Sequence, residues 1–182
     1  MPPSLRFALI LALMIVGGRA AADGPALGRI ATPEEIQRID IEVMPDGRGL
    51  PDGEGRVSAG AALFAQKCAS CHGEKGHGGP NGSLAGEALH SPQAFAADRS
   101  LKKIVGNYWP YATTVFDYIR RAMPYDRPGS LSDAEIYDVT AYVLYLNGLL
   151  DEDQTIDRRS LAAIEMPARS SFRAADAGRD AP

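Results

Sequence analysis

The stretch Cys68-Ala69-Ser70-Cys71-His72 places two thiols three residues apart and an imidazole directly after the second thiol. This order suits the covalent attachment of a haem. Each thiol can add to one of the two vinyl groups along a porphyrin edge, and the adjacent histidine is then directed at the iron. The motif therefore predicts one covalent haem c, held by Cys68 and Cys71, with His72 as a metal ligand.

A C-x-x-C pair also occurs in redox dithiols, zinc sites and disulfides. A zinc site needs a second pair of ligands. The chain has only two cysteines, however, and His77 and His90 stand apart from each other and from the motif. A thioredoxin-like dithiol needs a βαβ context, and no strand pattern surrounds the motif. We therefore favour the haem interpretation and expect His77 and His90 to be exposed rather than ligating.

Helical signals on both sides of the motif predict an all-α domain over residues 57–150. Ser58 is a candidate N-cap for the helix that leads into the motif. Gly60 and Phe64 share one face of that helix, which leaves a notch for a crossing helix. Residues 110–122 form a second helix with apolar residues at three-four spacing. A third begins at Ser132 with a capping box to Glu135 and ends at Asn147-Gly148.

The two ends of the chain differ in composition from this domain. Residues 1–22 combine a basic start, a ten-residue apolar run and an A-x-A site, which predicts a cleaved secretory signal and a periplasmic protein. The apolar run is too short to span a bilayer, so we expect no membrane anchor. Residues 23–56, rich in Gly, Pro and charge, predict an N-terminal extended arm with one short helix capped by Thr32. Residues 151–182 predict an irregular C-terminal tail.

Charge also restricts the partners. The chain has 19 Lys and Arg residues, two of which lie in the signal, so the mature protein keeps 17 basic against 23 acidic side chains. This balance argues against nucleic acid. It is compatible with docking to a basic protein surface, although a solvated acidic surface is more common.

The second axial position of the iron separates electron carriers from ligand-binding haems. Met123 follows a helix end and precedes a proline that keeps the backbone extended, so its thioether can point inward. We favour Met123 as the second metal ligand over a methionine that only fills the core. Met166 is the alternative, and Met44 in the arm is poorly placed.

Two further segments are candidates for contacts around the haem. A carbonyl within Gly79-Pro80-Asn81 can accept the other ring N–H of His72, although a plain turn explains the loop equally well. Trp109 and Tyr111 carry polar groups that can hydrogen-bond the haem propionates, but buried aromatics with incidental polar tips are just as common.

Five segments together resemble the class I cytochrome c subunits of periplasmic molybdenum-dependent sulfite and sulfur dehydrogenases. The resemblance covers roughly residues 27–150 and includes the arm, which ordinary class I carriers lack. Its segments are Leu27 to Ile36, Pro45 to Pro51, Gly106 to Pro124, Ser130 to Asp133 and Leu146 to Gly148.

The resemblance implies an electron-accepting subunit rather than the catalytic one. In that family a molybdopterin subunit oxidises sulfite or a sulfane sulfur, and the cytochrome passes the electrons to a soluble cytochrome c. The cytochrome of the Sox sulfur dehydrogenase commonly has a second haem-binding domain, whereas this chain has a single C-x-x-C-H motif. We therefore expect the monohaem subunit of a sulfite dehydrogenase. The alternatives are a shortened Sox subunit, a freely diffusing carrier, and a catalytic or gas-sensing haem with an open distal position.

Overall fold

The computed structural model describes residues 28–86, 98 and 100–173. The predicted signal over residues 1–22 and His90 lie outside the described residues. The chain divides into two units, residues 1–39 and 40–182, and each is described by itself.

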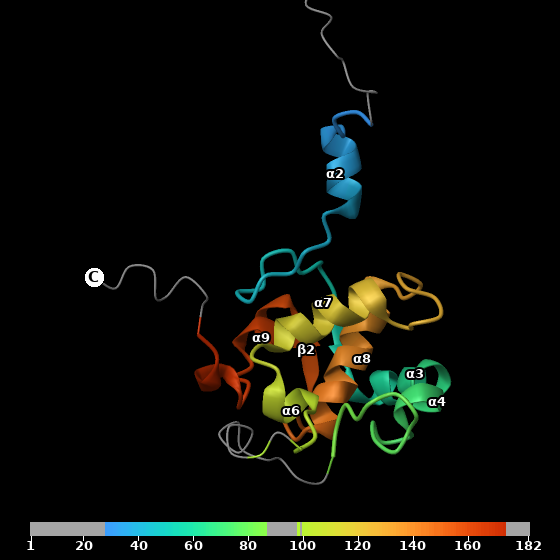
Figure 1. The fold of residues 1–182 in the computed structure, drawn as a ribbon, viewed down its shortest axis with the longest axis vertical. Helices are drawn as coiled ribbons and strands as arrows, with labels where there is room; N and C mark the ends of the chain where they lie inside the picture. The colour runs from blue at the N-terminus through green and yellow to red at the C-terminus, as the bar shows by residue number, and fades with distance from the viewer. Residues whose placement is uncertain (1–27, 87–97, 99, 174–182) are drawn as a thin grey trace, which may run out of the picture. The chain divides into compact units, whose positions relative to one another are not determined.

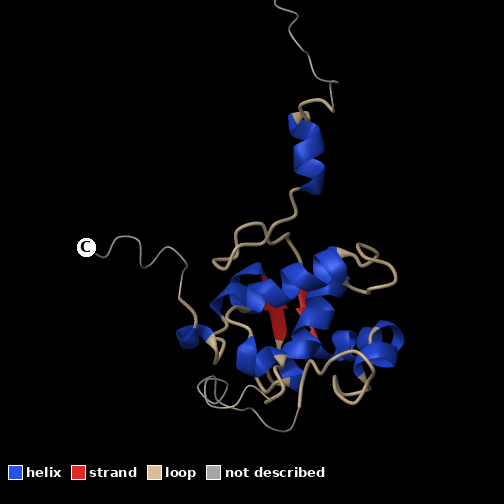
Figure 2. Cartoon of the chain, viewed as in Figure 1, coloured by secondary structure: helices blue, strands red, loops and turns tan. Residues whose placement is uncertain are grey.

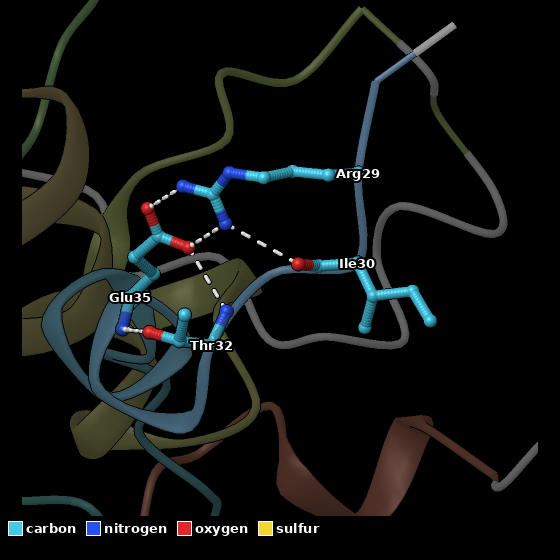
Figure 3. A network of polar contacts seen from close by, with 4 residues as sticks. All are labelled: Arg29, Ile30, Thr32 and Glu35. Atoms are coloured by element: carbon cyan, nitrogen blue, oxygen red, sulfur yellow. Dashed lines mark hydrogen bonds and ion pairs between the residues drawn. The ribbon is translucent and has the colours of Figure 1, made fainter. Parts of the chain in front are cut away.

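The described part of the first unit contains helix α2 (Pro33–Ile39), which begins with the predicted capping box. The Thr32 hydroxyl accepts a hydrogen bond from the Glu35 N–H at 3.2 Å, and the Glu35 carboxylate accepts one from the Thr32 N–H at 2.9 Å. Figure 3 shows the guanidinium of Arg29 paired with the same carboxylate, an interaction that lowers the pKa of Glu35. This local network fixes the start of the helix, but no residue of α2 is buried.

The second unit is mostly helical, as predicted (Figure 2). Its main helices are α3 (Val57–Lys67), α4 (Ala69–His72), α6 (Val105–Tyr108), α7 (Ala112–Ala122), α8 (Asp133–Leu146) and α9 (Arg158–Ala163), followed by the 3-10 turn η1 (Arg169–Ser171). Strands β1 (Glu54–Arg56) and β2 (Thr155–Asp157) form an antiparallel pair. In Figure 1, α8 runs through the middle of this unit, and α3, α6 and α7 surround it.

Helices α3 and α8 cross at Gly60, as the glycine notch predicts. A Cβ atom at Gly60 would lie 1.9 Å from the Asp138 carbonyl oxygen and 2.8 Å from the Tyr142 Cβ. The rings of Phe64 and Tyr142 pack beside this crossing, 5.3 Å apart. The absence of a side chain at Gly60 therefore sets the distance between the helix that leads into the haem motif and the central helix.

Gly60→Ala should destabilise the domain, because the added methyl group meets backbone of α8 rather than a flexible side chain. We expect a loss of about 1–3 kcal/mol in the free energy of unfolding, as for other overpacked sites. Gly86→Ala is the matched control, since a Cβ there has no neighbour within 4 Å. Urea denaturation of the two variants measures the difference, and equal midpoints would contradict the close crossing.

The end of the predicted arm packs on the helical body of the second unit itself. Val43 and Leu50 are buried, and the Val43 N–H donates to the Asp117 carboxylate of α7 at 3.0 Å. The Tyr137 hydroxyl of α8 donates to the Pro51 carbonyl at 2.9 Å. The glycines and prolines of this segment let it follow the surface of the body, so residues 43–56 belong to the second unit.

The segment after residue 150 contains more regular structure than the irregular tail expected from its composition. Its β2 pairs with β1, with Gly55 opposite Ile156, and α9 follows directly. Ile156, Leu161, Met166 and Ala168 are each at most 3% exposed. The segment has few apolar residues, but these four all point into the core, and composition alone does not reveal that placement.

The predicted first residues of the helices lie close to the observed ones. Helix α3 begins at Val57 rather than after Ser58, because β1 leads straight into it and its N-cap, Arg56, donates its N–H to Asp138. Helix α7 begins at Ala112, two residues later than expected. The capping box of Ser132 and Glu135 at the start of α8 is present as predicted.

Candidate functional site

The C-x-x-C-H motif forms a single helical turn. Cys68 ends α3 and caps α4, and its carbonyl accepts hydrogen bonds from the N–H groups of Cys71 at 3.1 Å and His72 at 3.0 Å. Residues three apart on such a turn lie on the same side. The turn therefore presents both thiols, each partly exposed and neither in a disulfide, toward one face.

His72 is oriented by a backbone contact. Its Nδ1 lies 3.2 Å from the carbonyl oxygen of Gly82. A carbonyl can only accept a hydrogen bond, so Nδ1 carries the proton and Nε2 keeps a free lone pair for a metal. The predicted kind of contact is present, but the acceptor lies just beyond Gly79-Pro80-Asn81. Pro80 itself is exposed.

Two glycines allow the loop after His72 to pack closely against the motif. A Cβ at Gly73, where φ is +83°, would lie 1.9 Å from the His77 carbonyl oxygen. A Cβ at Gly79 would lie 2.3 Å from the Cys71 carbonyl oxygen, which accepts a hydrogen bond from the Asn81 N–H at 3.0 Å. The loop therefore brings the Gly82 carbonyl back to His72, a role for its glycines that sequence analysis missed.

Burial affects the first thiol of the motif. It raises the pKa of Cys68 to about 11, and the neighbouring Cys71 adds to the effect. The thiolate is the reactive form in disulfide exchange, so the raised pKa disfavours exchange at Cys68 at neutral pH.

The two candidate methionines lie in different surroundings. Met166 is 3% exposed and belongs to the hydrophobic core. Met123 is the extended C-cap of α7 and packs only partly buried against that core, as do Cys68 and Trp109. A side chain at the edge of the core is free to ligate a group bound there, whereas Met166 is already enclosed by apolar neighbours.

The predicted propionate contacts involve residues with other partners in the protein. Trp109 is partly buried, and its ring packs edge-on against Tyr118 at 5.6 Å. Tyr111 caps the start of α7 and lies under the guanidinium of Arg169 at 4.7 Å. These packing contacts leave the prediction of propionate hydrogen bonds open.

Two buried asparagines support the site and were not singled out for this role from the sequence. Asn147 accepts a hydrogen bond from the Gly106 N–H and donates to the Leu84 carbonyl, joining α8, α6 and the end of the haem-motif loop. Asn107 closes the start of α6 by accepting from the Ile104 N–H at 2.9 Å. Asn147 was recognisable only as a helix stop.

The donor set fits haem c. Two thiols lie on one turn, and the next residue is an imidazole whose Nε2 is free. Within residues 28–86, 98 and 100–173, no group of three or more His, Cys, Asp and Glu side chains is arranged to hold a metal ion. His77 is exposed, as expected. Among the described helices, none has the length and apolar character that a membrane span requires.

Comparisons with known proteins agree with this geometry. The family model for cytochrome c matches residues 57–147. The chain is 32% identical over 114 residues to a thiosulfate dehydrogenase of Psychrobacter arcticus, covering 60% of this chain and 33% of the relative. It is 26% identical over 125 residues to the thiosulfate dehydrogenase of Allochromatium vinosum, covering 68% and 40% respectively. The chain thus spans only about a third of the length of these curated relatives.

A solved structure gives a longer match. The chain superposes on a chain in the crystal structure of the sulfane dehydrogenase SoxCD from Paracoccus pantotrophus with a TM-score of 0.72 and 38% sequence identity. The match covers 87% of this chain and 77% of that chain.

Proposed function

The chain belongs to the cytochrome c family, with haem c as its cofactor, and from this premise we propose that it is the electron-accepting subunit of a periplasmic molybdenum-dependent sulfite dehydrogenase. The long match to a chain of the SoxCD sulfane dehydrogenase carries the electron-accepting role. The sulfur-compound dehydrogenases among the relatives support that role. The choice of a sulfite dehydrogenase rests on the single C-x-x-C-H motif.

Different residues of the site would hold different parts of the cofactor. Cys68 and Cys71 would hold it through thioether bonds, His72 would bind the iron through Nε2, and Met123 would supply a second iron ligand. When bound, the haem supplies one-electron redox chemistry. The Gly82 carbonyl fixes the ring of His72. The hydrophobic core beside Met123 would keep water away from the iron ligand that Met123 supplies.

The stoichiometry of sulfite oxidation explains why a second carrier is needed. Oxidation of sulfite to sulfate releases two electrons, and a single haem accepts one at a time. The cytochrome must therefore be reoxidised between the two transfers, and a soluble cytochrome c is the proposed acceptor.

A sulfane dehydrogenase of the SoxCD type is the second candidate partner. The 38% identity to a chain of that enzyme favours it, whereas the single haem motif favours a sulfite dehydrogenase. The two proposals share the same cofactor and the same direction of electron flow, and they differ in the substrate of the catalytic subunit.

Stopped-flow reduction of the haem tests the proposal. The purified ferric cytochrome should stay oxidised with sulfite or thiosulfate alone. It should be reduced by sulfite once the co-purified catalytic subunit, checked for molybdenum, is added. Reduction by a sulfane donor but not by sulfite would move the assignment to the second candidate, and rapid reduction by thiosulfate without any partner would overturn both.

Helix α2 is the proposed contact with the catalytic subunit. A seven-residue helix is marginal in water by itself. Its apolar side chains Ile36 and Ile39 are 51% and 76% exposed, and Ile30 before it is 94% exposed.

Two truncations separate docking from folding. Deletion of residues 23–39 should weaken the complex by about tenfold or more, because burial of even one isoleucine is worth about 1.5–3 kcal/mol and 1.4 kcal/mol is a factor of ten. The spectrum and stability of the haem domain should not change. Deletion of residues 23–56 should prevent folding, since it removes β1, Val43 and Leu50. Titration calorimetry and thermal unfolding provide the readouts, and wild-type affinity after the shorter deletion would exclude α2 from the interface.

A further inference from the structure

A strap formed by residues 164–173 follows α9 and lies beyond the part of the chain that the cytochrome c family model matches. Met166 and Ala168 anchor it, since they are 3% and 0% exposed. In Figure 1 the strap, drawn in red, lies on the side of the second unit where α6 and the start of α7 meet. Buried anchors at its base show that the strap is held against the body and not merely appended to it.

The end of the strap contacts an aromatic corner formed by residues 108–111, which joins α6 to α7. The ring of Phe172 meets that of Tyr108 edge-on, with centroids 5.7 Å apart and planes at 77°. The guanidinium of Arg169 lies 4.7 Å from the centroid of the Tyr111 ring, and its Nη1 donates to the Phe172 carbonyl at 3.3 Å. Phe172 and Arg169 thus hold the first and the last residue of the corner.

The corner packs on the same hydrophobic core as two residues expected to hold the haem. Trp109, between the two residues that the strap holds, packs against the same hydrophobic core as Cys68 and Met123. Tyr111 is the N-cap of α7, and Met123 is the C-cap of the same helix. A displacement of the corner would therefore move Trp109 and the helix that carries Met123.

We propose that Arg169 and Phe172 are positioning residues that hold the aromatic corner against the bound haem and keep water out of that side of the site. The inference rests on the haem assignment but not on the identity of the catalytic partner. Release of the corner should admit water, and a more polar surrounding stabilises the ferric form with its extra positive charge. The reduction potential should therefore fall.

Trp109 provides a direct readout, because it is the one tryptophan in the chain. A bound haem quenches tryptophan emission by energy transfer, and the quenching weakens steeply as the distance grows. Arg169→Ala and Phe172→Ala should each increase Trp109 emission in the loaded protein and shift the midpoint potential to a lower value. Arg173→Ala is the matched control, since it removes an exposed arginine of the same strap.

A further variant separates position from charge. Arg169→Lys keeps the positive charge but loses the planar group that stacks on Tyr111. If the strap acts by position, Arg169→Lys should behave like Arg169→Ala, and the uncharged Phe172→Ala should show the same changes.

The outcomes distinguish this inference from its alternatives. A purely structural strap would lower the unfolding temperature of both alanine variants while leaving emission and potential equal to those of Arg173→Ala, and this result would overturn the proposal. Recovery of the wild-type potential in Arg169→Lys, with no effect of Phe172→Ala, would assign the effect to charge and would also overturn it. Absence of a haem adduct in the wild type would instead contradict the haem assignment itself.

Discussion

Replacement of both Cys68 and Cys71 by serine should give a chain that carries no haem after denaturation, whereas each single replacement should leave at most one thioether bond. A serine hydroxyl does not add to a porphyrin vinyl group as a thiol does. Both sulfurs lie on the turn that begins at Cys68, so each is expected to form its own bond. Mass spectrometry of denatured periplasmic protein measures the adduct directly.

Ser70→Ala is the control for the cysteine variants. Ser70 is exposed and lies between the two thiols in the sequence. Its hydroxyl donates to the Cys71 sulfur at 3.9 Å. Haem should remain fully attached in this variant. A wild-type chain without any adduct would end the haem interpretation, and loss of haem from Ser70→Ala would show that attachment depends on more than the two thiols and His72.

Met123→Ala should lower the reduction potential of the haem and open a site for carbon monoxide on the ferrous iron. A thioether ligand favours ferrous iron, and its removal would leave a ligand position of the iron to water or an added ligand. Met123 ends α7 in an extended conformation at the edge of the core, where a side chain can reach a bound group. The visible spectrum checks this through loss of the weak band near the red end that marks thioether ligation of ferric haem.

Met166→Ala serves as the matched variant. Met166 is enclosed in the core, so its truncation should cost about 2–5 kcal/mol of folding stability without changing the ligation of the iron. We therefore expect opposite results from the two variants. Met123→Ala should change the ligation of the iron without a large loss of stability, and Met166→Ala should lower stability without changing the ligation. A Met166 variant that alone loses the six-coordinate spectrum would reverse the assignment.

Much of the site could be predicted from short stretches of sequence. The attachment motif, the two capping boxes and the glycine notch each depend on residues no more than four positions apart. Hydrogen bonds and side-chain spacing within one or two turns fix such features, whatever the rest of the chain does. The acceptor of His72 was predicted less accurately, because the path of a glycine-rich loop depends on close approaches that composition does not encode.

The packing of residues 43–56 and 155–172 on the body depended on tertiary structure. Glu54 pairs with Asp157, and Phe172 meets Tyr108, contacts between residues that are far apart in sequence. No local pattern marks Ile156 and Leu161 as core residues within a mostly charged segment, because their burial becomes favourable only once β1 and α7 offer a surface. The residues that attach the haem could therefore be recognised from their local order. The residues proposed to enclose and position it are brought together by long-range packing. The free energy gained by such packing depends on which distant surfaces meet, and no local stretch of sequence contains that information.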